Sequence, residues 1–178
     1  MTDVETREAT PDDWESWRDI RLRSLLENPD AFGSTHEREA AYDQSTWRSR
    51  LDGSAGPSIL AYGGGTPVGM GAGWLYEPGR IMIVAMWTDP AWRGRGVGRS
   101  VLNHVVGWAR RRGLEPELWV ADTNPEARRL YESYGFRSDG ETSPLRAGSA
   151  INKSRLVLPD PPAAPDPAGA HPACIDRT

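Results

Sequence analysis

The sequence has 178 residues, enough for one domain with a hydrophobic core, and its net charge of -4 argues against a nucleic-acid-binding protein, which is usually basic. The N-terminus lacks the basic start and apolar run of a secretory signal, and no stretch is apolar for long enough to cross a membrane. The single cysteine, Cys174, allows no intramolecular disulfide, so a cytoplasmic protein with no membrane or nucleic-acid partner is expected.

The first half of the chain predicts a strand, two helices and three further strands. A short first strand is expected over 4–8, and Thr10 and Pro11 then favour a helix start, because threonine caps helices and proline suits the first helical position. This helix ends before Pro29, since the residue that precedes a proline is driven out of the helical region. A second helix is expected over 45–51, and the segment before it shows little periodicity. The three strands cover 58–62, 68–76 and 81–87.

Three glycines occupy alternate interior positions of the second of these strands: Gly69, Gly71 and Gly73. A glycine inside a strand has no side chain to pack, so it indicates either a bulge or the close approach of another element. We therefore expect one of these two features along this strand.

The second half of the chain predicts alternating helices and strands. The strongest amphipathic helix covers 98–112 and is followed by a strand over 116–121. Asn124 caps the next helix, and a last strand covers 151–158. This order predicts one α/β domain with a mixed sheet over residues 1–158. The Pro/Ala-rich segment 159–178 has too little apolar bulk for a core, so a disordered tail is expected there.

The segment Arg93–Arg99 joins a predicted strand to the strongest helix and carries the clearest chemistry. Its alternate glycines, Gly94, Gly96 and Gly98, place backbone N–H groups in a tight loop that no side chain blocks. The loop runs into a helix N-terminus, whose free N–H groups and dipole favour an anion. Three arginines in the same segment add permanent positive charge that pairs well with phosphate oxygens. A diphosphate is the expected ligand.

Two common diphosphate motifs fit this segment poorly. A Walker loop requires a lysine that is absent here, and a Rossmann fingerprint requires a different glycine spacing after the first strand. The run Arg93–Gly98 instead resembles the [QR]-x-x-G-x-[GA] signature of the GNAT superfamily of N-acetyltransferases. The lead-in 88–90 and the later segment 124–136 extend the resemblance over roughly residues 4–158.

The resemblance implies a GNAT-like mixed central β-sheet flanked by helices, with splayed central strands, and acetyl-CoA as the cofactor. The strand that ends at residue 88 would bond the pantetheine arm, the loop would hold the pyrophosphate, and a backbone N–H near Trp87 would stabilise the oxyanion. Tyr131 is implied as the catalytic general acid that protonates the departing thiolate. The implied cofactor-binding residues are Met86, Trp87, Thr88, Arg93, Gly94, Arg95, Gly96, Val97, Gly98, Arg99, Asn124, Ala127, Leu130 and Tyr131.

The implied acceptor is a primary amine, on a small molecule, that attacks the thioester directly in a ternary complex. The predicted substrate-binding residues are Phe32, Trp74, Glu77 and Trp87. Many family members carry a glutamate as general base on the strand that corresponds to 81–87, and this sequence has no carboxylate there. The weaker candidates for the base are Glu37, Glu77 and Asp122. No His, Cys or Asp cluster has metal-ligand spacing, so no metal is expected, and a homodimer is possible by resemblance.

Other functions and roles remain open at this stage. The same fold serves protein N-terminal and lysine acetyltransferases, because function is set by the site and not by the fold. The missing strand carboxylate motivates a non-catalytic acyl-CoA-binding module. At the level of residues, Tyr131 has the alternative role of a packed aromatic, and Asn124 that of a helix cap alone.

Overall fold

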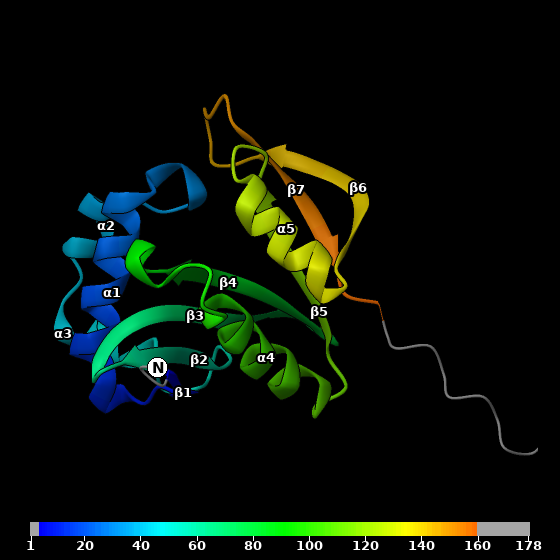
Figure 1. Ribbon diagram of the computed structural model, residues 1–178. Helices are drawn as coiled ribbons and strands as arrows, with labels where there is room; N and C mark the ends of the chain where they lie inside the picture. The colour runs from blue at the N-terminus through cyan, green and yellow to red at the C-terminus, as the bar shows by residue number, and fades with distance from the viewer. Residues whose placement is uncertain (1–3, 160–178) are drawn as a thin grey trace, which may run out of the picture.

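The structure, a computed structural model, describes residues 4–159 and contains one seven-stranded mixed sheet with helices on both faces (Figure 1). The strands lie in the order β1-β2-β3-β4-β5-β7-β6. They cover β1 Val4–Glu8, β2 Ser58–Gly63, β3 Thr66–Glu77, β4 Arg80–Thr88, β5 Glu115–Ala121, β6 Arg137–Pro144 and β7 Asn152–Val157. The α-helices are α1 Trp14–Glu27, α2 His36–Ala40, α3 Gln44–Ser49, α4 Val97–Arg110 and α5 Pro125–Tyr134, and the 3-10 turns are η1 Pro11–Asp13, η2 Pro29–Ala31 and η3 Pro90–Trp92. The predicted α/β architecture is confirmed.

The central strands β4 and β5 separate part-way along their length. They run parallel and are paired only up to Ile83 and Leu118, whereas all other neighbouring strands of the described sheet are antiparallel. Beyond that point β4 continues to Thr88 and β5 to Ala121 without pairing to each other. The splayed pair that the resemblance implied is therefore present, and it opens a gap in the middle of the sheet.

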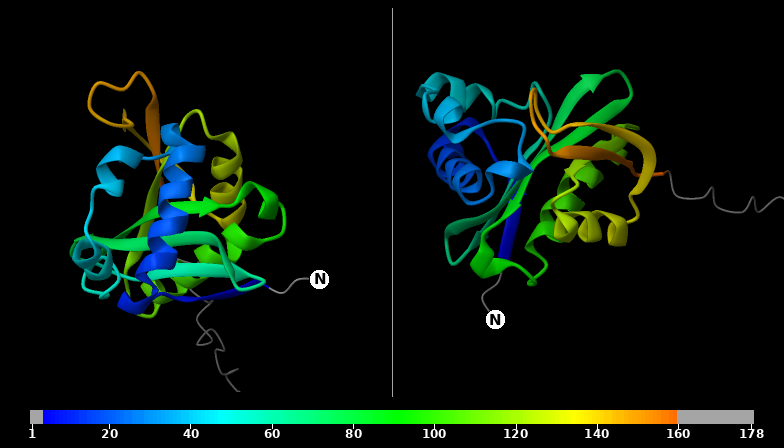
Figure 2. Two further views of the ribbon diagram at one scale, coloured as in Figure 1. Left: turned by 90° about the vertical axis from the view of Figure 1, so that its left-hand side faces the viewer. Right: turned by 90° about the horizontal axis from the view of Figure 1, so that it is seen from above.

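Helices cover the two faces of the sheet in separate groups, α4 and α5 on one face and α1 to α3 on the other (Figure 2). Strand β2 shows the division, because its side chains alternate between the faces. Ile59 and Ala61 pack in the cluster that contains α4, and Leu60 packs in the cluster that contains α1. Each face of the sheet thus has its own buried apolar layer.

The glycines of β3 let α4 approach the sheet closely. A Cβ atom built at Gly69 would lie 2.4 Å from Cγ1 of Val97, and one at Gly71 would lie 2.7 Å from Cγ1 of Val101 and 2.4 Å from Sδ of Met86. Any side chain at either position would push α4 outward, since real Cβ atoms do not approach so closely. These glycines therefore help to set where α4 begins relative to the gap.

One α-helix and one strand were not predicted. Helix α2 has only five residues, begins at the cap Thr35, and is too short to show helical periodicity. Strand β6 is an edge strand whose residues are almost all exposed, so it lacks the apolar alternation that marks a strand. The disordered tail expected over 159–178 lies outside the described residues, apart from Pro159. Within the described part, no helix is long and apolar enough to cross a membrane.

Candidate active site

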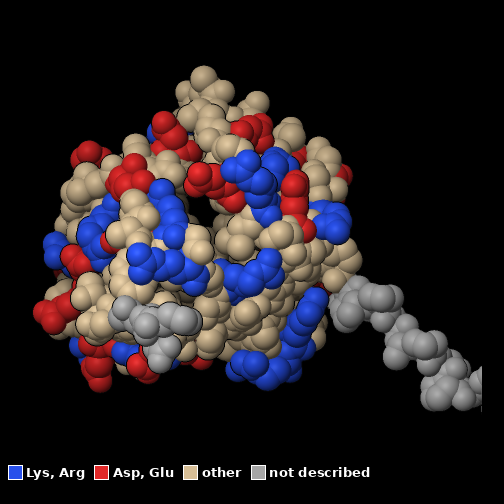
Figure 3. All heavy atoms as spheres, in the orientation of Figure 1, with Lys and Arg blue, Asp and Glu red and all other residues tan. Residues whose placement is uncertain are grey.

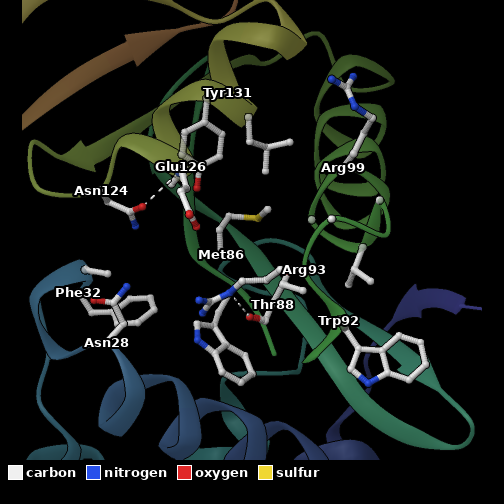
Figure 4. Close-up of a pocket in the computed structure, with 18 residues that line it drawn as sticks. Asn28, Phe32, Met86, Thr88, Trp92, Arg93, Arg99, Asn124, Glu126 and Tyr131 are labelled. Carbon is white, nitrogen blue, oxygen red and sulfur yellow. Dashed lines mark hydrogen bonds between the residues drawn. The ribbon is translucent and has the colours of Figure 1, made fainter. Parts of the chain in front are cut away.

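A cavity with a volume of about 370 Å³ lies between α4 and α5 at the gap of the sheet. The surface in Figure 3 is hollowed near its middle, with basic atoms close to the opening. Figure 4 shows the lining side chains arranged around this space. They are Asn28, Ala31, Phe32, Met86, Trp87, Thr88, Trp92, Arg93, Gly94, Gly96, Val97, Gly98, Arg99, Asn124, Glu126, Ala127, Leu130 and Tyr131. Thirteen of the fourteen predicted cofactor residues are in this set, and Arg95 is not.

The glycine-rich loop forms the entrance of α4. Gly94 and Gly96 have φ of 74° and 82°, in the left-handed region that residues other than glycine rarely adopt. Gly96 caps α4, and the first helical bond runs from Ser100 N to Gly96 O, so the N–H groups of the first turn have no partner within the helix. These free N–H groups and the positive end of the helix dipole suit an anion at this edge of the cavity.

The three arginines of the loop have different contact partners. Arg93 donates to the carbonyl of Thr88 at 3.1 Å and to Glu27 at 2.9 Å, so its guanidinium links the loop to α1. Arg95 lies over the ring of Trp92 and outside the cavity lining. Arg99 lines the cavity and donates to Ser133 of α5. Only Arg99 therefore combines a place in the cavity wall with a guanidinium free of any carboxylate among the described ion pairs.

Helix α5 closes the opposite side of the cavity. The side chain of Asn124 accepts from the N–H of Ala127 at 3.1 Å, so the predicted cap is formed, and both residues line the cavity. Leu130 lies against the start of α4, where a Cβ built at Gly98 would be 3.1 Å from Leu130 Cδ2. The absence of a side chain at Gly98 thus keeps the two helices close at the entrance.

Tyr131 reaches from α5 toward Met86 in the middle of the cavity (Figure 4). Its side chain is only 7% exposed, and its ring packs edge-on against Phe136 at 6.1 Å between centroids. Burial raises the pKa of the Tyr131 hydroxyl above its usual value, and no neighbouring charge opposes the rise. The phenol therefore keeps its proton at neutral pH and is available as a donor in the cavity.

Strand β4 supplies the floor of the cavity and carries a bulge there. Met70 of β3 pairs with Trp87 of β4, and Ala72 of β3 pairs with Val84. The two pairs are thus two residues apart on β3 but three residues apart on β4. The extra residue is accommodated at Ala85. Its φ of 56° is a conformation that is uncommon for a residue other than glycine. Such a bulge turns backbone groups beside Met86 away from the regular ladder, next to Tyr131 in the lining.

Trp87 and Phe32 both line the cavity but have their side chains largely buried. The indole N–H of Trp87 donates to Glu27 of α1 at 3.0 Å, and its exposure is 7%. Phe32 is 8% exposed and lies under the guanidinium of Arg21, whose Cζ is 4.8 Å from the ring centroid. Arg21 in turn makes a bidentate pair with Glu39 at 2.9 and 2.7 Å. The buried Arg21–Glu39 ion pair thus supports the part of the cavity wall that Phe32 forms.

The remaining predicted acceptor residues lie elsewhere. Trp74 is 51% exposed, and neither it nor Glu77 lines the cavity. The candidate bases Glu37 and Asp122 are also exposed and outside the lining, and Asp122 accepts a hydrogen bond from Ser154 at 2.7 Å. The structure therefore does not bring these four side chains to the cavity lining.

Sequence reasoning missed four lining residues: Asn28, Ala31, Trp92 and Glu126. Glu126 is the only acidic side chain in the lining of the described cavity. Its position two residues after the cap Asn124, in the first turn of the predicted helix, was a signal that could have located it. The described residues contain no group of three or more His, Cys, Asp or Glu side chains that could hold a metal ion.

The split sheet, the glycine-rich loop and the buried tyrosine meet at one cavity. This combination is the architecture of an α/β acyltransferase. A family model makes the assignment specific. Residues 14–136 match the Acetyltransferase (GNAT) family, so the chain belongs to this family. The predicted family is confirmed, and it is a family of acetyltransferases, the class of enzyme that the sequence predicted.

Individual relatives resemble the chain in part. A mycothiol acetyltransferase from Beutenbergia cavernae is 29% identical over 128 residues, which are 68% of this chain and 40% of the relative. The N-alpha-acetyltransferase RimI of Mycobacterium tuberculosis is 34% identical over 86 residues, 48% of this chain and 50% of the relative. The chain thus spans half or less of the length of these curated relatives. A solved yncA acetyltransferase from Salmonella typhimurium with acetyl-CoA has a TM-score of 0.72 at 20% identity, over 93% of this chain and 99% of that one, which shows the shared fold.

Proposed function

We propose that the protein transfers an acetyl group from acetyl-CoA to the primary amine of a small molecule, by direct attack in a ternary complex. The observation that carries the proposal is one continuous cavity that joins the anion-binding entrance of α4 to the buried hydroxyl-bearing ring of Tyr131. A ligand that bears both a diphosphate and a reactive group would place the two at these positions.

The residues present fit acetyl-CoA. The left-handed Gly94 and Gly96 leave backbone N–H groups at the start of α4 for the pyrophosphate, and Arg99 adds positive charge beside them. Leu130 and Met86 give apolar surface further inside for the pantetheine arm. The bound cofactor would supply an acetyl group activated as a thioester.

Two side chains would transfer protons, one as general acid and one as general base. Tyr131 holds a proton at neutral pH, as a phenol with an ordinary pKa of about 10 does, and burial raises its pKa further, so it can donate to a departing thiolate. Glu126 supplies the only carboxylate of the cavity lining within residues 4–159, and we propose that it accepts the proton of the ammonium group, directly or through water. Backbone N–H groups released by the bulge at Ala85 would face the carbonyl oxygen, as an oxyanion requires.

The size of the cavity favours a small acceptor. A volume of about 370 Å³ takes the acyl thioester and a small amine, whereas a protein acceptor would have to insert an extended N-terminus. One relative is named for mycothiol and another for N-alpha acetylation, so acetylation of a protein N-terminus is the competing function. Trp74 and Glu77 as acceptor residues, the cytoplasmic location and a homodimer stay sequence-based predictions.

The test is calorimetric titration with acetyl-CoA, followed by thiol-release assays over a panel of small amines and of N-terminal peptides. Tight binding with release for a class of small amines is the expected result. Release with peptides alone would replace the small acceptor by a protein N-terminus. Binding without release would favour the non-catalytic acyl-CoA-binding module, and absence of binding would refute the site.

A further inference from the structure

The cavity has two chemically different ends. Arg99 and the glycine loop form one end, and Asn28, Ala31 and Phe32 form the opposite end (Figure 4). If the anion-binding end holds the cofactor, as proposed above, the amine must use the other end. We call residues 28–32 the acceptor wall. Their conformation decides how wide this end of the cavity is.

The acceptor wall has little secondary structure of its own. Its only regular element is the 3-10 turn η2, and its one internal backbone bond described here runs from Ala31 N to Asn28 O at 3.1 Å. A single turn of this type is weakly stable, because few hydrogen bonds offset the entropy of ordering it. Contacts from elsewhere in the chain must therefore hold the wall in place.

Arg146 supplies these contacts from the connection between β6 and β7. One guanidinium nitrogen, Nη1, donates to the carbonyl of Pro29 at 3.1 Å and to that of Phe32 at 3.2 Å. The other, Nη2, lies 3.5 Å from the carboxylate of Asp30. The connection that carries Arg146 is the orange loop that reaches toward the blue N-terminal helices in Figure 2. A single side chain thus joins both ends of the turn to a segment more than a hundred residues away.

The β6–β7 connection can act as a fixed anchor. Leu145 is buried, with 5% of its surface exposed, and its N–H donates to the carbonyl of Ile151 at 2.8 Å. The N–H of Ser149 donates back to the carbonyl of Arg146 at 3.0 Å, which closes the turn. Arg146 does not itself line the cavity, so its effect on an acceptor must pass through the wall.

We infer that Arg146 is a specificity-determining positioning residue, which holds the acceptor wall and so limits the size of the amine that this end of the cavity admits. The inference rests on the proposed function. With the wall held, the Phe32 ring stays against the guanidinium of Arg21, and the acceptor end of the cavity keeps its shape. Without Arg146, the turn loses two hydrogen bonds and an ion pair, and bulkier amines gain access.

The experiment compares Arg146→Ala, Arg146→Lys and the control Arg155→Ala with the wild type. Arg155 lies on β7 and pairs with Asp139, away from the acceptor wall. Amide hydrogen exchange of the peptide that contains residues 28–33 should speed up by about tenfold in Arg146→Ala, because net hydrogen bonds of this kind stabilise by about one kcal/mol each. The ratio of kcat/KM for a linear over an α-branched amine should fall by about fivefold or more. Arg146→Lys should recover part of both effects, since lysine keeps the charge and loses the fork geometry.

The expected pattern is faster exchange with a smaller selectivity ratio, while the KM for acetyl-CoA and both readouts of Arg155→Ala stay at wild-type values. Unchanged exchange in Arg146→Ala would overturn the anchoring role. Faster exchange with an unchanged ratio would overturn the role in specificity. A wild type that turns over no amine would remove the proposed function and the acceptor preference together, and the exchange data alone would then decide whether Arg146 holds the wall.

Discussion

The two ends of the cavity are built in different ways. The cofactor end, made of residues 88–99 and the start of α5, lies where regular elements begin and end, and its geometry comes from glycines and helix caps within a short stretch of sequence. The acceptor wall, residues 28–32, has one 3-10 turn and depends on Arg146 for its position. An anion site can thus be built from local sequence, whereas this acceptor site requires contacts between distant segments.

The electrostatics of the two ends also differ. At the cofactor end, the positive charges are near the surface and Arg99 is available to a ligand. Behind the acceptor wall, the charges of Arg21 and Glu39 are buried and paired with each other, and Arg50 adds a third contact at 3.2 Å. Charge is therefore open to a ligand at one end and supports a wall at the other. The predictions below test this division, from the largest expected effect to the smallest.

The first prediction concerns Tyr131, which lies between the two ends. Tyr131→Phe should lower kcat by about 10²–10⁴-fold, the usual contribution of a general acid, with little change in the affinity for acetyl-CoA. Steady-state kinetics and calorimetry on the same variant check this. Tyr134→Phe is the matched control, because Tyr134 is on the same helix and outside the cavity lining. Full activity of Tyr131→Phe would leave Tyr131 as a packed aromatic.

The second prediction concerns the buried support of the acceptor wall. Glu39→Gln should lower the free energy of unfolding by about 3 kcal/mol, because it leaves Arg21 as a buried charge without a counter-ion. Urea unfolding monitored by circular dichroism measures it. Glu37→Gln, an exposed position on the same helix, should change the unfolding free energy by less than about 0.5 kcal/mol. Equal stability of Glu39→Gln and wild type would show that the pair contributes nothing.

The same pair gives a pH dependence. Burial acts to raise the pKa of Glu39, but hydrogen bonds and charge from Arg21 outweigh it, and the pKa lies below its usual value. A lowered pKa means that the stabilisation is present above the unfolded pKa of about 4.3 and is lost as the pH falls below that value. Unfolding free energies measured from pH 6 to pH 3 should therefore fall less steeply for Glu39→Gln than for the wild type.

The sequence predicted the cofactor end more fully than the acceptor wall, for a physical reason. A cap such as Asn124 and a left-handed glycine such as Gly96 act within a few residues, so their pattern is readable in one chain. Arg146 bonds to Pro29 and Phe32, which precede it in the sequence by 117 and 114 positions. No local sequence pattern indicates such contacts. Strand β6 was missed for a similar reason, since an exposed edge strand takes its pairing from its neighbour β7 and not from its own apolar residues.

The third prediction tests the cofactor end. Gly96→Asp should weaken acetyl-CoA binding by about 100-fold, because it places a negative charge where the pyrophosphate would sit and a side chain where φ is 82°. A Cβ at Gly96 would meet no atom within 4 Å, so the effect should come from charge and backbone strain and not from a blocked loop. Gly96→Ala separates the two, since it keeps the strain and lacks the charge. Gly113→Asp, at the other end of α4 with φ of 68°, should leave the dissociation constant unchanged.

The last prediction concerns Glu126, the carboxylate that the structure adds to the site. Glu126→Gln should lower kcat/KM for the amine by about tenfold near neutral pH, and the loss should shrink at high pH, where more of the amine is already deprotonated. Measuring kcat/KM from pH 6 to pH 10 checks this, with Glu132→Gln, exposed on the same helix, as the control. A uniform loss at every pH would instead indicate that Glu126 contributes to binding. Unchanged kinetics would remove Glu126 from the reaction and leave proton removal to water, and a cavity lining without a working carboxylate would then suit an acceptor that arrives as the neutral amine.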